Sequence, residues 1–212
     1  MADWLNLTFY SFDRNILEFM HGLAESSGEI LTPLMKFITL IGEKGLWMFA
    51  LAAVLMCFSK TRKIGVCLFG AVCCGALITN IVLKDTVARL RPFEWNPELY
   101  GAWWQAVGSP AEDGFSFPSG HVTAAMAGVT ALVLAWRKKW MPLGFLYVIV
   151  MAFSRNYLMA HFPSDVVAAV LIGAFSGVVA WFITKGIFAF LEKYRANRFC
   201  SFLLEFNLIS KK

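Results

Sequence analysis

The spacing of two basic residues, Lys84 and Arg91, suits the binding of one anion. Lys84 and Arg91 lie seven residues apart, about two helical turns, so one helix through both would present them on the same side. Pro92 should end that helix. Neighbouring cations repel each other unless an anion lies between them, and Arg155 supplies a third cation from another segment. Three fixed cations suit a phosphoryl group, because arginine donates paired hydrogen bonds to phosphate oxygens.

The stretch Pro-Ser-Gly-His at residues 118–121 supplies a second part of an anion site. It directly precedes an apolar run, and the N–H groups in the first turn of a helix lack intrahelical partners. Helix N-termini bind phosphate for this reason, and Gly120 lets the backbone approach a ligand closely. Taken alone, the stretch is also explained by Ser119 at a helix cap with His121 following by chance. The cations favour the anion site.

Only three histidines occur in the chain, and His121 and His161 both belong to this pattern. His161 precedes Asp165 by four residues. A carboxylate can hold one imidazole nitrogen as N–H, which leaves the other nitrogen free as a nucleophile. The alternative is a histidine that caps a helix start. The third, His21, falls on the polar face of a helical stripe and is expected to be solvated.

The composition is that of an integral membrane protein. Hydrophobic residues make up 58% of the chain and charged residues 16%, whereas soluble domains carry about 45–50% and about 25%. The net charge of +5 is explained by basic cytoplasmic loops rather than by nucleic-acid binding, since no basic face with interleaved aromatic residues occurs. The five cysteines are expected to be buried hydrophobic residues, because no pair has metal-ligand spacing with a histidine.

Five apolar segments could cross a bilayer, which takes about 20 residues. They cover residues 45–58, 64–83, 122–136, 140–159 and 166–190. Upstream, residues 12–25 carry an amphipathic helical stripe, and a further helix is expected to begin with Thr32 as N-cap and Pro33 as its first residue. We expect these two helices to lie on the membrane surface, with a sixth span as the alternative.

The predicted fold is therefore all-α, a polytopic transmembrane helical bundle of about five to six spans. We expect residues 1–44 to form the amphipathic surface helices, residues 45–191 the transmembrane catalytic core, and residues 192–212 a basic cytoplasmic tail.

Charge gives the orientation of the spans. The basic runs at residues 60–63 and 137–139, together with the tail, should be cytoplasmic by the positive-inside rule. No lysine or arginine occurs between Arg91 and Arg137, so the long loop at residues 92–118 should face outward. This topology brings all the candidate site residues to the non-cytoplasmic ends of the spans.

Three motifs together resemble the signature of the type 2 phosphatidic acid phosphatase (PAP2) superfamily. They are KDTVARLRP at residues 84–92, PSGH at residues 118–121 and SRNYLMAHFPSD at residues 154–165. The family pattern is lysine, six residues and Arg-Pro, then Pro-Ser-Gly-His, then Ser-Arg, five residues, histidine, three residues and aspartate. Every element occurs here in order. The resemblance implies a membrane-embedded helical bundle that acts on lipid phosphates.

The resemblance and the residue chemistry agree on a role for each site residue. His161 is expected to attack phosphorus and form a phosphohistidine, with Asp165 orienting its ring. His121 is expected to protonate the leaving oxygen and then to activate water. The phosphoryl oxygens are expected to be held by Lys84, Arg91, Ser119, Gly120 and Arg155. No metal or other cofactor is expected, because the cations and the helix N-terminus supply the positive field.

The predicted function is that of an integral lipid phosphatase of the cell membrane, with its active site on the non-cytoplasmic face. It would remove the terminal phosphate of a lipid phosphate or pyrophosphate, with undecaprenyl pyrophosphate as the first candidate. Membrane lipids are the other expected partners, and no oligomeric state is predicted. The alternatives are a phosphotransferase that uses a lipid pyrophosphate donor, and a non-catalytic lipid-phosphate binder or transporter. A vanadate-dependent haloperoxidase, a rival within the fold, is disfavoured by the membrane embedding.

Overall fold

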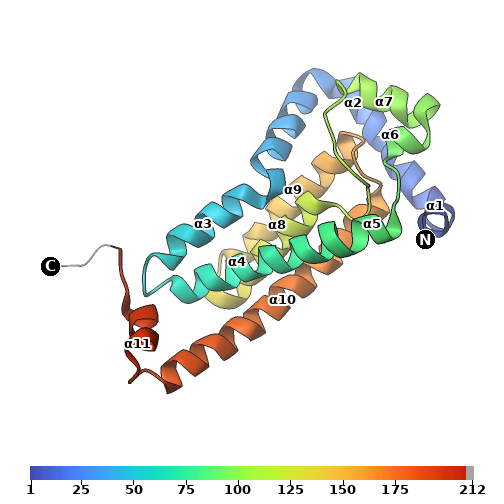
Figure 1. Ribbon diagram of the computed structural model, residues 1–212. Coiled ribbons are helices and arrows are strands. Elements are labelled where there is room, and N and C mark those ends of the chain that lie inside the picture. The colour runs from blue at the N-terminus through green and yellow to red at the C-terminus, as the bar shows by residue number, and fades with distance from the viewer. Residues whose placement is uncertain (209–212) are drawn as a thin grey trace.

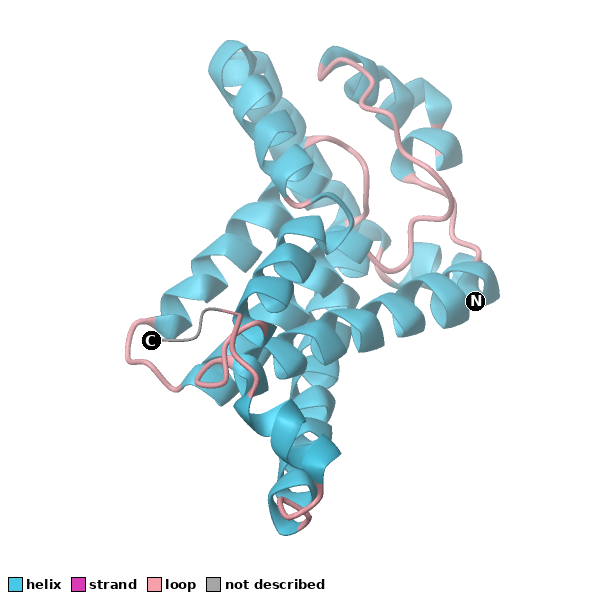
Figure 2. Cartoon of the chain, turned by 60° about the vertical axis from the view of Figure 1, so that its left-hand side comes forward, coloured by secondary structure: helices cyan, strands magenta, loops and turns pink. Residues whose placement is uncertain are grey.

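The computed structural model describes residues 1–208 of the chain. Throughout this range the regular elements are helices joined by loops, without a strand (Figures 1 and 2). The prediction of an all-α fold is therefore confirmed. The long helices run side by side in a bundle, and the shorter helices α5 (Lys84–Val87), α6 (Pro92–Trp95) and α7 (Ala102–Ala106) gather towards one end (Figure 1).

The remaining helices follow in chain order. The first part of the chain, up to α5, forms α1 (Ala2–Thr8), α2 (Tyr10–Ile41), the 3-10 helix η1 (Glu43–Gly45), α3 (Leu46–Met56), α4 (Arg62–Ala76) and the π-helix η2 (Leu77–Leu83). A second π-helix, η3 (Pro97–Gly101), separates α6 from α7. The rest of the described chain forms α8 (Gly120–Trp136), the 3-10 helix η4 (Met141–Leu143), α9 (Gly144–Tyr157), α10 (Pro163–Lys193) and α11 (Arg198–Glu205).

Three helices, α4, α8 and α10, pack against one another along the centre of the bundle. The contact between α8 and α10 is close because α10 presents glycines there. A Cβ on Gly173 would lie 2.7 Å from Met126 Cβ, and one on Gly177 would lie 2.6 Å from Thr130 Cβ. Small residues let helices approach in this way in lipid, where no hydrophobic force drives helices together. Around this centre α3 packs on α4, α9 on α8 and α2 on α9.

The outer surface of the bundle is apolar. On α10 the side chains of Leu171, Phe175 and Phe182 are 60–67% exposed, which fits contact with lipid. Within residues 1–208, Arg62–Trp95 and Pro163–Lys193 are each long and apolar enough to cross a membrane, and the bent pair α2 and α3 could make a third span. The structure is therefore that of a membrane protein, whereas the total of five or six spans stays a prediction.

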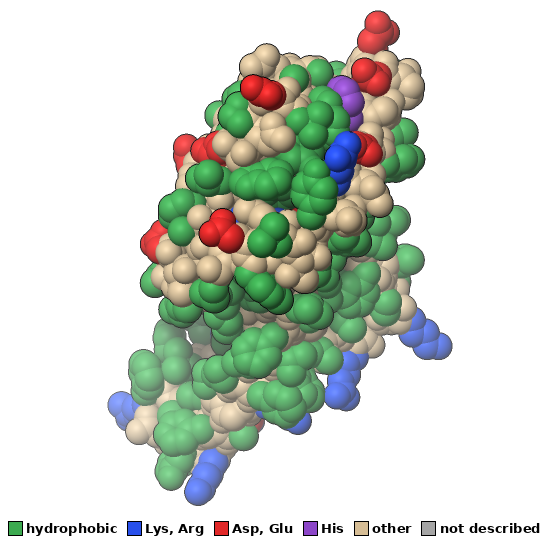
Figure 3. Space-filling view, turned by 90° about the vertical axis from the view of Figure 1, so that its right-hand side faces the viewer, with side chains coloured by type: hydrophobic (Ala, Val, Ile, Leu, Met, Phe, Trp, Pro, Cys, Tyr) green, Lys and Arg blue, Asp and Glu red, His purple; other side chains and the backbone are tan. Residues whose placement is uncertain are grey.

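Charged side chains divide between the two ends of the bundle. On the face shown in Figure 3, acidic side chains gather towards one end and most lysine and arginine side chains towards the other, with apolar side chains between them. The gathering of lysine and arginine at one end is what the positive-inside rule predicts for the cytoplasmic side of a membrane protein. It agrees with the charge asymmetry from which the outward orientation of the long loop is predicted.

The N-terminal helices differ from the prediction. α2 consists of two helical segments that meet at a kink at Ser27, where φ is −141° and the backbone is not helical. The second segment continues through Pro33, and the hydroxyl of Thr32 lies 2.8 Å from the hydroxyl of Tyr157 instead of capping a new helix. A second helical segment is therefore present as predicted, but it begins after Ser27 rather than with Thr32 as N-cap and Pro33 as first residue.

On the polar face predicted for residues 12–25, Arg14, Glu18 and Glu25 are exposed, whereas Asp13 is buried and His21 is partly covered. Asp13 is 2% exposed and pairs with the buried side chain of Arg89. The ring of His21 stacks on the ring of Trp103, with centroids 4.6 Å apart. The expectation of a solvated His21 is therefore wrong, since the outer loop folds against this side of α2.

The helix that carries Lys84 ends earlier than predicted. α4 continues through η2 into α5, which stops at Val87, and Ala88 takes the left-handed conformation with a φ of 50°. Residues 88–91 are not helical, so Lys84 and Arg91 do not lie two turns apart on one helix. Arg91 instead precedes Pro92 as the N-cap of α6. The turn after Val87, rather than helical periodicity, places the two cations at the same site.

Candidate active site

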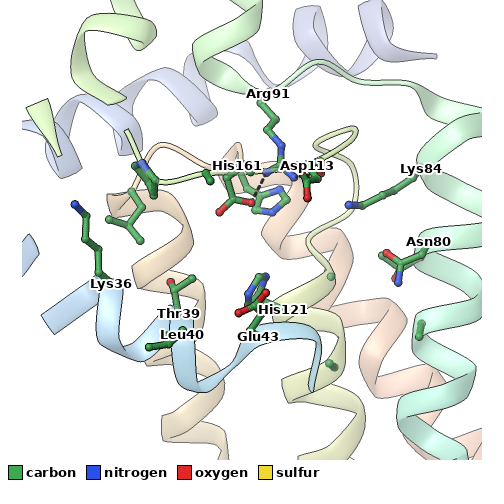
Figure 4. Close-up of a pocket in the computed structure, with 18 of the residues that line it drawn as sticks. Lys36, Thr39, Leu40, Glu43, Asn80, Lys84, Arg91, Asp113, His121 and His161 are labelled. Carbon is green, nitrogen blue, oxygen red and sulfur yellow. Dashed lines mark hydrogen bonds and ion pairs between the residues drawn. The ribbon is translucent and has the colours of Figure 1, made fainter. Parts of the chain in front are cut away.

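A cavity of about 610 Å³ lies where the outer loop meets the ends of α2, η2 and α8. Its walls include five of the eight predicted site residues, namely Lys84, Arg91, Gly120, His121 and His161. Figure 4 shows the two histidines and the side chains of Lys84 and Arg91 directed towards the same space. The other three predicted residues, Ser119, Arg155 and Asp165, lie behind this wall and are fully buried.

Arg91 and Arg155 share one carboxylate. Oε2 of Glu112 lies 3.0 Å from Nη1 of Arg91, and Oε1 of Glu112 pairs with Nη2 of Arg155. The two guanidinium groups are therefore separated by about the width of one carboxylate group. Two oxygens of a phosphoryl group could bridge donors that are spaced in this way.

Ser119 stands at the start of α8 as its N-cap residue, in an extended conformation. Its hydroxyl makes no cap hydrogen bond, so helix capping alone does not explain this serine. A Cβ on Gly120 would lie 3.7 Å from Oδ1 of Asn80, an ordinary contact. Packing therefore does not demand glycine at this position. The absence of a side chain at Gly120 leaves the N–H groups of the first turn accessible to a ligand.

His161 lies in the link between α9 and α10 and is 1% exposed. Its Nδ1 lies 2.7 Å from the backbone carbonyl oxygen of Ser116. Because a carbonyl oxygen can only accept, Nδ1 carries the hydrogen and Nε2 holds the lone pair. The neutral ring thus has one fixed nitrogen and one nitrogen able to act as a nucleophile.

Asp165 does not touch the imidazole of His161, because its Oδ2 lies 3.9 Å from Nδ1. Oδ2 accepts instead from the hydroxyl of Ser116 at 2.5 Å and from the backbone N–H of Phe162 at 3.0 Å. The direct hydrogen bond expected from the sequence is replaced by one to the Ser116 carbonyl. Asp165 thus holds the side chain of Ser116 and the backbone of Phe162 on the two sides of the ring, rather than the ring itself.

Arg89, which the sequence analysis did not single out, holds Asp165 from behind. It is fully buried, with Nη1 2.5 Å from Oδ1 of Asp165 and Nη2 2.8 Å from Oδ2 of Asp13. Its Nε donates to Oδ1 of Asn6 at 2.8 Å, and its guanidinium lies 4.0 Å from the ring centroid of Phe162. A buried arginine paired on both sides in this way ties α1 and α2 to the start of α10.

Four residues that make contacts with the predicted site residues or support them were therefore not expected from the sequence. Arg89 carried a usable signal, since a charged residue at the end of an apolar span is costly unless it is paired. Asp13 looked like one of several acidic residues on an amphipathic helix. Ser116 and Glu112 lie in a polar loop where their residue types are common, so nothing in the sequence marks them.

The surroundings of His161 lower its pKa well below the ordinary value of histidine. Burial of the ring is the main cause, and the positive charges of Arg91, Arg155 and Lys84 add to it. The neutral form of the imidazole is thereby favoured, which is the form that a nucleophile requires.

Three buried polar atoms at the site find no hydrogen-bond partner in the described part of the chain. They are Ser119 Oγ, His121 Nε2 and Arg155 Nε. Buried polar groups are nearly always paired, because leaving one unpaired costs about 1–3 kcal/mol. These atoms lie beside a cavity that also receives Lys84 and Arg91, and a ligand rich in acceptor oxygens would satisfy such donors.

Together these features define a helical membrane protein with a cationic cavity that carries two histidines. Residues 64–188 match the PAP2 superfamily. The chain belongs to this superfamily, and the resemblance noted in its three motifs is confirmed.

Individual relatives are similar over most of the chain. An undecaprenyl-diphosphatase of Sulfolobus acidocaldarius is 33% identical over 145 residues, which cover 68% of this chain and 66%, just under two thirds, of that protein. A lipid A 4'-phosphatase of Bacteroides thetaiotaomicron is 30% identical over 164 residues, which cover 74% of this chain and 72% of that protein. The transmembrane PAP2 type phosphatidylglycerolphosphate phosphatase from Bacillus subtilis has a similar fold, with a TM-score of 0.53 and 22% identity over 92% of this chain and 99% of that one.

Proposed function

We propose that this protein hydrolyses the terminal phosphate of a membrane lipid phosphate or pyrophosphate on the non-cytoplasmic side of the membrane. The observation that carries the proposal is the meeting of two cations and two histidines around one cavity: Lys84, Arg91, His121 and His161. Membership of the PAP2 superfamily supports it. So do the names of the relatives, an undecaprenyl-diphosphatase and a lipid A phosphatase.

In the first half-reaction Nε2 of His161 attacks phosphorus, and the bond from phosphorus to the leaving oxygen breaks. The negative charge of the bound phosphoryl group favours the protonated form of His121, which donates its proton to that oxygen as it departs. The charge on the phosphoryl oxygens is balanced by the three cations and by the N-terminus of α8. The Ser116 carbonyl keeps Nδ1 of His161 protonated throughout, so the attacking nitrogen stays the same.

In the second half-reaction water attacks the phosphohistidine. His121, now neutral, accepts a proton from this water, and the nitrogen–phosphorus bond breaks to release inorganic phosphate. Both histidines then return to their starting protonation states. The cations supply the positive field for both steps, so we propose that no metal ion takes part.

The substrate is proposed to be a lipid because the cavity lies at the end of an apolar bundle. Its hydrocarbon tail would remain in the bilayer while its phosphate reaches the helix ends. Undecaprenyl pyrophosphate is the first candidate, since the relative that is 33% identical is an undecaprenyl-diphosphatase. Lipid A is the second, because the other relative is a lipid A phosphatase.

The test is phosphate release by the purified full chain in detergent micelles, over a panel of undecaprenyl pyrophosphate, lipid A and phosphatidic acid. We expect release with at least one lipid, and unchanged release in EDTA. Transfer of the phosphoryl group to an added lipid alcohol instead of water would identify a phosphotransferase. Binding of the lipids without any turnover would identify a non-catalytic binder or transporter.

The division of roles is tested with a substrate that needs little leaving-group protonation, such as a labelled nitrophenyl phosphate. His121→Ala should still form the phosphohistidine and then hydrolyse it slowly, whereas His161→Ala should form no covalent intermediate. Labelled protein is trapped without acid, because phosphohistidine is acid-labile. Equal labelling of the two variants would contradict the assignment.

A further inference from the structure

The carboxylate of Glu112 occupies the position between Arg91 and Arg155 that a phosphoryl group would need. It accepts from Nη1 of Arg91 at 3.0 Å and from Nη2 of Arg155, and its side chain is only 9% exposed. Glu112 lines the cavity beside His121 and His161. One protein carboxylate therefore uses the same N–H donors that are assigned to the substrate.

The two arginines depend on Glu112 to different degrees. Arg91 also donates to the backbone carbonyls of Asp113 at 2.7 Å, Gly114 at 3.0 Å and Ala160 at 2.9 Å. Its position is thus fixed without Glu112, and through Asp113 and Gly114 it also holds the loop backbone next to Glu112. Rotation of the Glu112 side chain, rather than opening of the loop, is the movement that the contacts allow.

Arg155 has few other partners. Its Nη1 lies 3.5 Å from the hydroxyl of Thr39, and its Nε is buried without a partner within residues 1–208. Its strong contact is the one with Glu112. If this carboxylate moves away, binding of another anion to Arg155 becomes favourable, because a buried charge without a partner is costly.

We propose that Glu112 is a built-in competitor of the phosphoryl group, which must displace this carboxylate from Arg91 and Arg155 in order to bind. The inference rests on the proposed function, because it concerns the same phosphoryl site. A carboxylate and a phosphoryl group cannot accept the same hydrogen bonds at once, and two anions in one buried site repel each other.

The competition has a defined consequence for affinity. Displacing Glu112 costs the same free energy whichever anion displaces it, so the affinity for every such anion falls by one common factor. Product phosphate is held less tightly for the same reason, and return of the carboxylate to the arginines assists its release. Glu112 thus prevents a strongly cationic site from being trapped by its own product.

The experiment measures binding of inorganic phosphate and of inorganic sulfate to the purified full chain by isothermal titration calorimetry, without any turnover. Glu112→Gln should bind both anions at least about tenfold more tightly, and by a similar factor for each, since no buried carboxylate has to leave its two arginines. Asp113→Asn is the matched control. Its exposed carboxylate lines the same cavity and makes none of the ion pairs found in residues 1–208.

Removal of the Asp113 charge should tighten binding by about threefold or less, because it acts only through space in a screened environment. Equal or weaker anion binding by Glu112→Gln, or an equal gain in the two variants, would overturn the proposal. Crystals of the unmodified protein with orthovanadate give a second measurement that needs no variant. Glu112 should then be separated from both arginines, and a carboxylate still paired with both would also overturn the proposal.

These outcomes are independent of the proposed function. If no lipid phosphate is hydrolysed, the function fails while the anion affinities still decide the role of Glu112. If phosphate is released but Glu112→Gln binds anions no more tightly, only the competition fails.

Discussion

The carboxylate of Asp165 and the imidazole of His161 are linked through Ser116 rather than to each other. Ser116 donates its hydroxyl to Oδ2 of Asp165 at 2.5 Å and accepts from Nδ1 of His161 through its carbonyl at 2.7 Å. The distance from Oδ2 to Nδ1 is 3.9 Å. Asp165 therefore acts on the ring by positioning a peptide carbonyl, and its contribution is separable from that of the nucleophile.

Removal of the nucleophile should be far more damaging than removal of the Asp165 charge. We expect His161→Ala to lower kcat by at least about three orders of magnitude, because no other group can form the covalent intermediate. Asp165→Asn should keep at least about tenfold more activity than His161→Ala, since it disturbs only the support of the ring. Rates of phosphate release and trapping of labelled enzyme measure both effects. Labelling should persist in Asp165→Asn, and its complete loss there would show that the carboxylate is needed for attack.

Arg89 should contribute strongly to stability. Arg89→Gln leaves the carboxylates of Asp13 and Asp165 buried without their cation, and loss of one partner of a buried pair costs about 3–5 kcal/mol. We expect a clearly lower Tm for thermal unfolding in detergent. Arg14→Gln is the matched control, because Arg14 forms an exposed pair with Glu18 and should change the Tm little. Equal Tm values for the two variants would mean that the Arg89 contacts are not the anchor described here.

The sequence contains enough to predict the centre of the site, because its signals are local. The motifs around Lys84, Ser119 and His161 each stand next to a long apolar run. Once charge orients these runs, the motifs are brought to the same side of the membrane. The starts of α8 and α10 follow from the same local signals, with a cap residue or a proline just ahead of an apolar helix.

The supporting contacts could not be predicted, because they join residues that are distant in the chain. Asp13 meets Arg89 and Ser164 only after α2 folds over the start of α10. Ala88 breaks the expected helix with a left-handed conformation that alanine rarely adopts, so residue type gives no warning of the turn. Glu112 is one acidic residue in an acidic loop, and only the fold shows that it lies between two buried arginines.

The orientation of the bundle is tested by labelling. A cysteine introduced at Gln105, in the outer loop, should react with an impermeant thiol reagent in intact cells, whereas one at Lys138 should react only after the cells are opened. Both positions are exposed, so a difference reports the side of the membrane. The unsubstituted chain, which keeps Cys57, Cys67, Cys73, Cys74 and Cys200, gives the background. The reverse pattern would overturn the proposed non-cytoplasmic site.

A substitution of Gly120 should weaken the use of the substrate without affecting folding. Gly120→Ala should leave the Tm nearly unchanged, because its Cβ would make only an ordinary contact at 3.7 Å with Asn80. The methyl group would nevertheless stand where the phosphoryl oxygens approach the first turn of α8. We expect kcat/KM to fall by at least about tenfold, as small displacements of a reacting group from its attack geometry cost about that much or more. Unchanged kcat/KM would show that the phosphoryl group does not use the start of this helix.

The depressed pKa of His161 gives a prediction with a definite sign. The imidazole attacks only when it is neutral, and its pKa is lowered by burial and by Arg91, Arg155 and Lys84. Protonation of His161 should therefore remove activity only at a pH below the ordinary value for histidine, about 6.5. Lys84→Met removes one positive charge from the site. It should raise the pKa of His161, so that the loss of the neutral ring begins at a higher pH.

Rates alone do not isolate this titration, because a phosphate monoester loses its own second proton near pH 6, and the two histidines are coupled. NMR of histidine labelled with ¹³C in the ring follows the imidazole directly, and the His161 signal is assigned by its absence in His161→Gln. Lys138→Met, at the opposite end of the bundle, removes the same charge far from the site and should leave the pKa unshifted. A fall in the pKa of His161 in Lys84→Met, or equal shifts in the two variants, would show that the cation at position 84 does not hold the nucleophile in its neutral form.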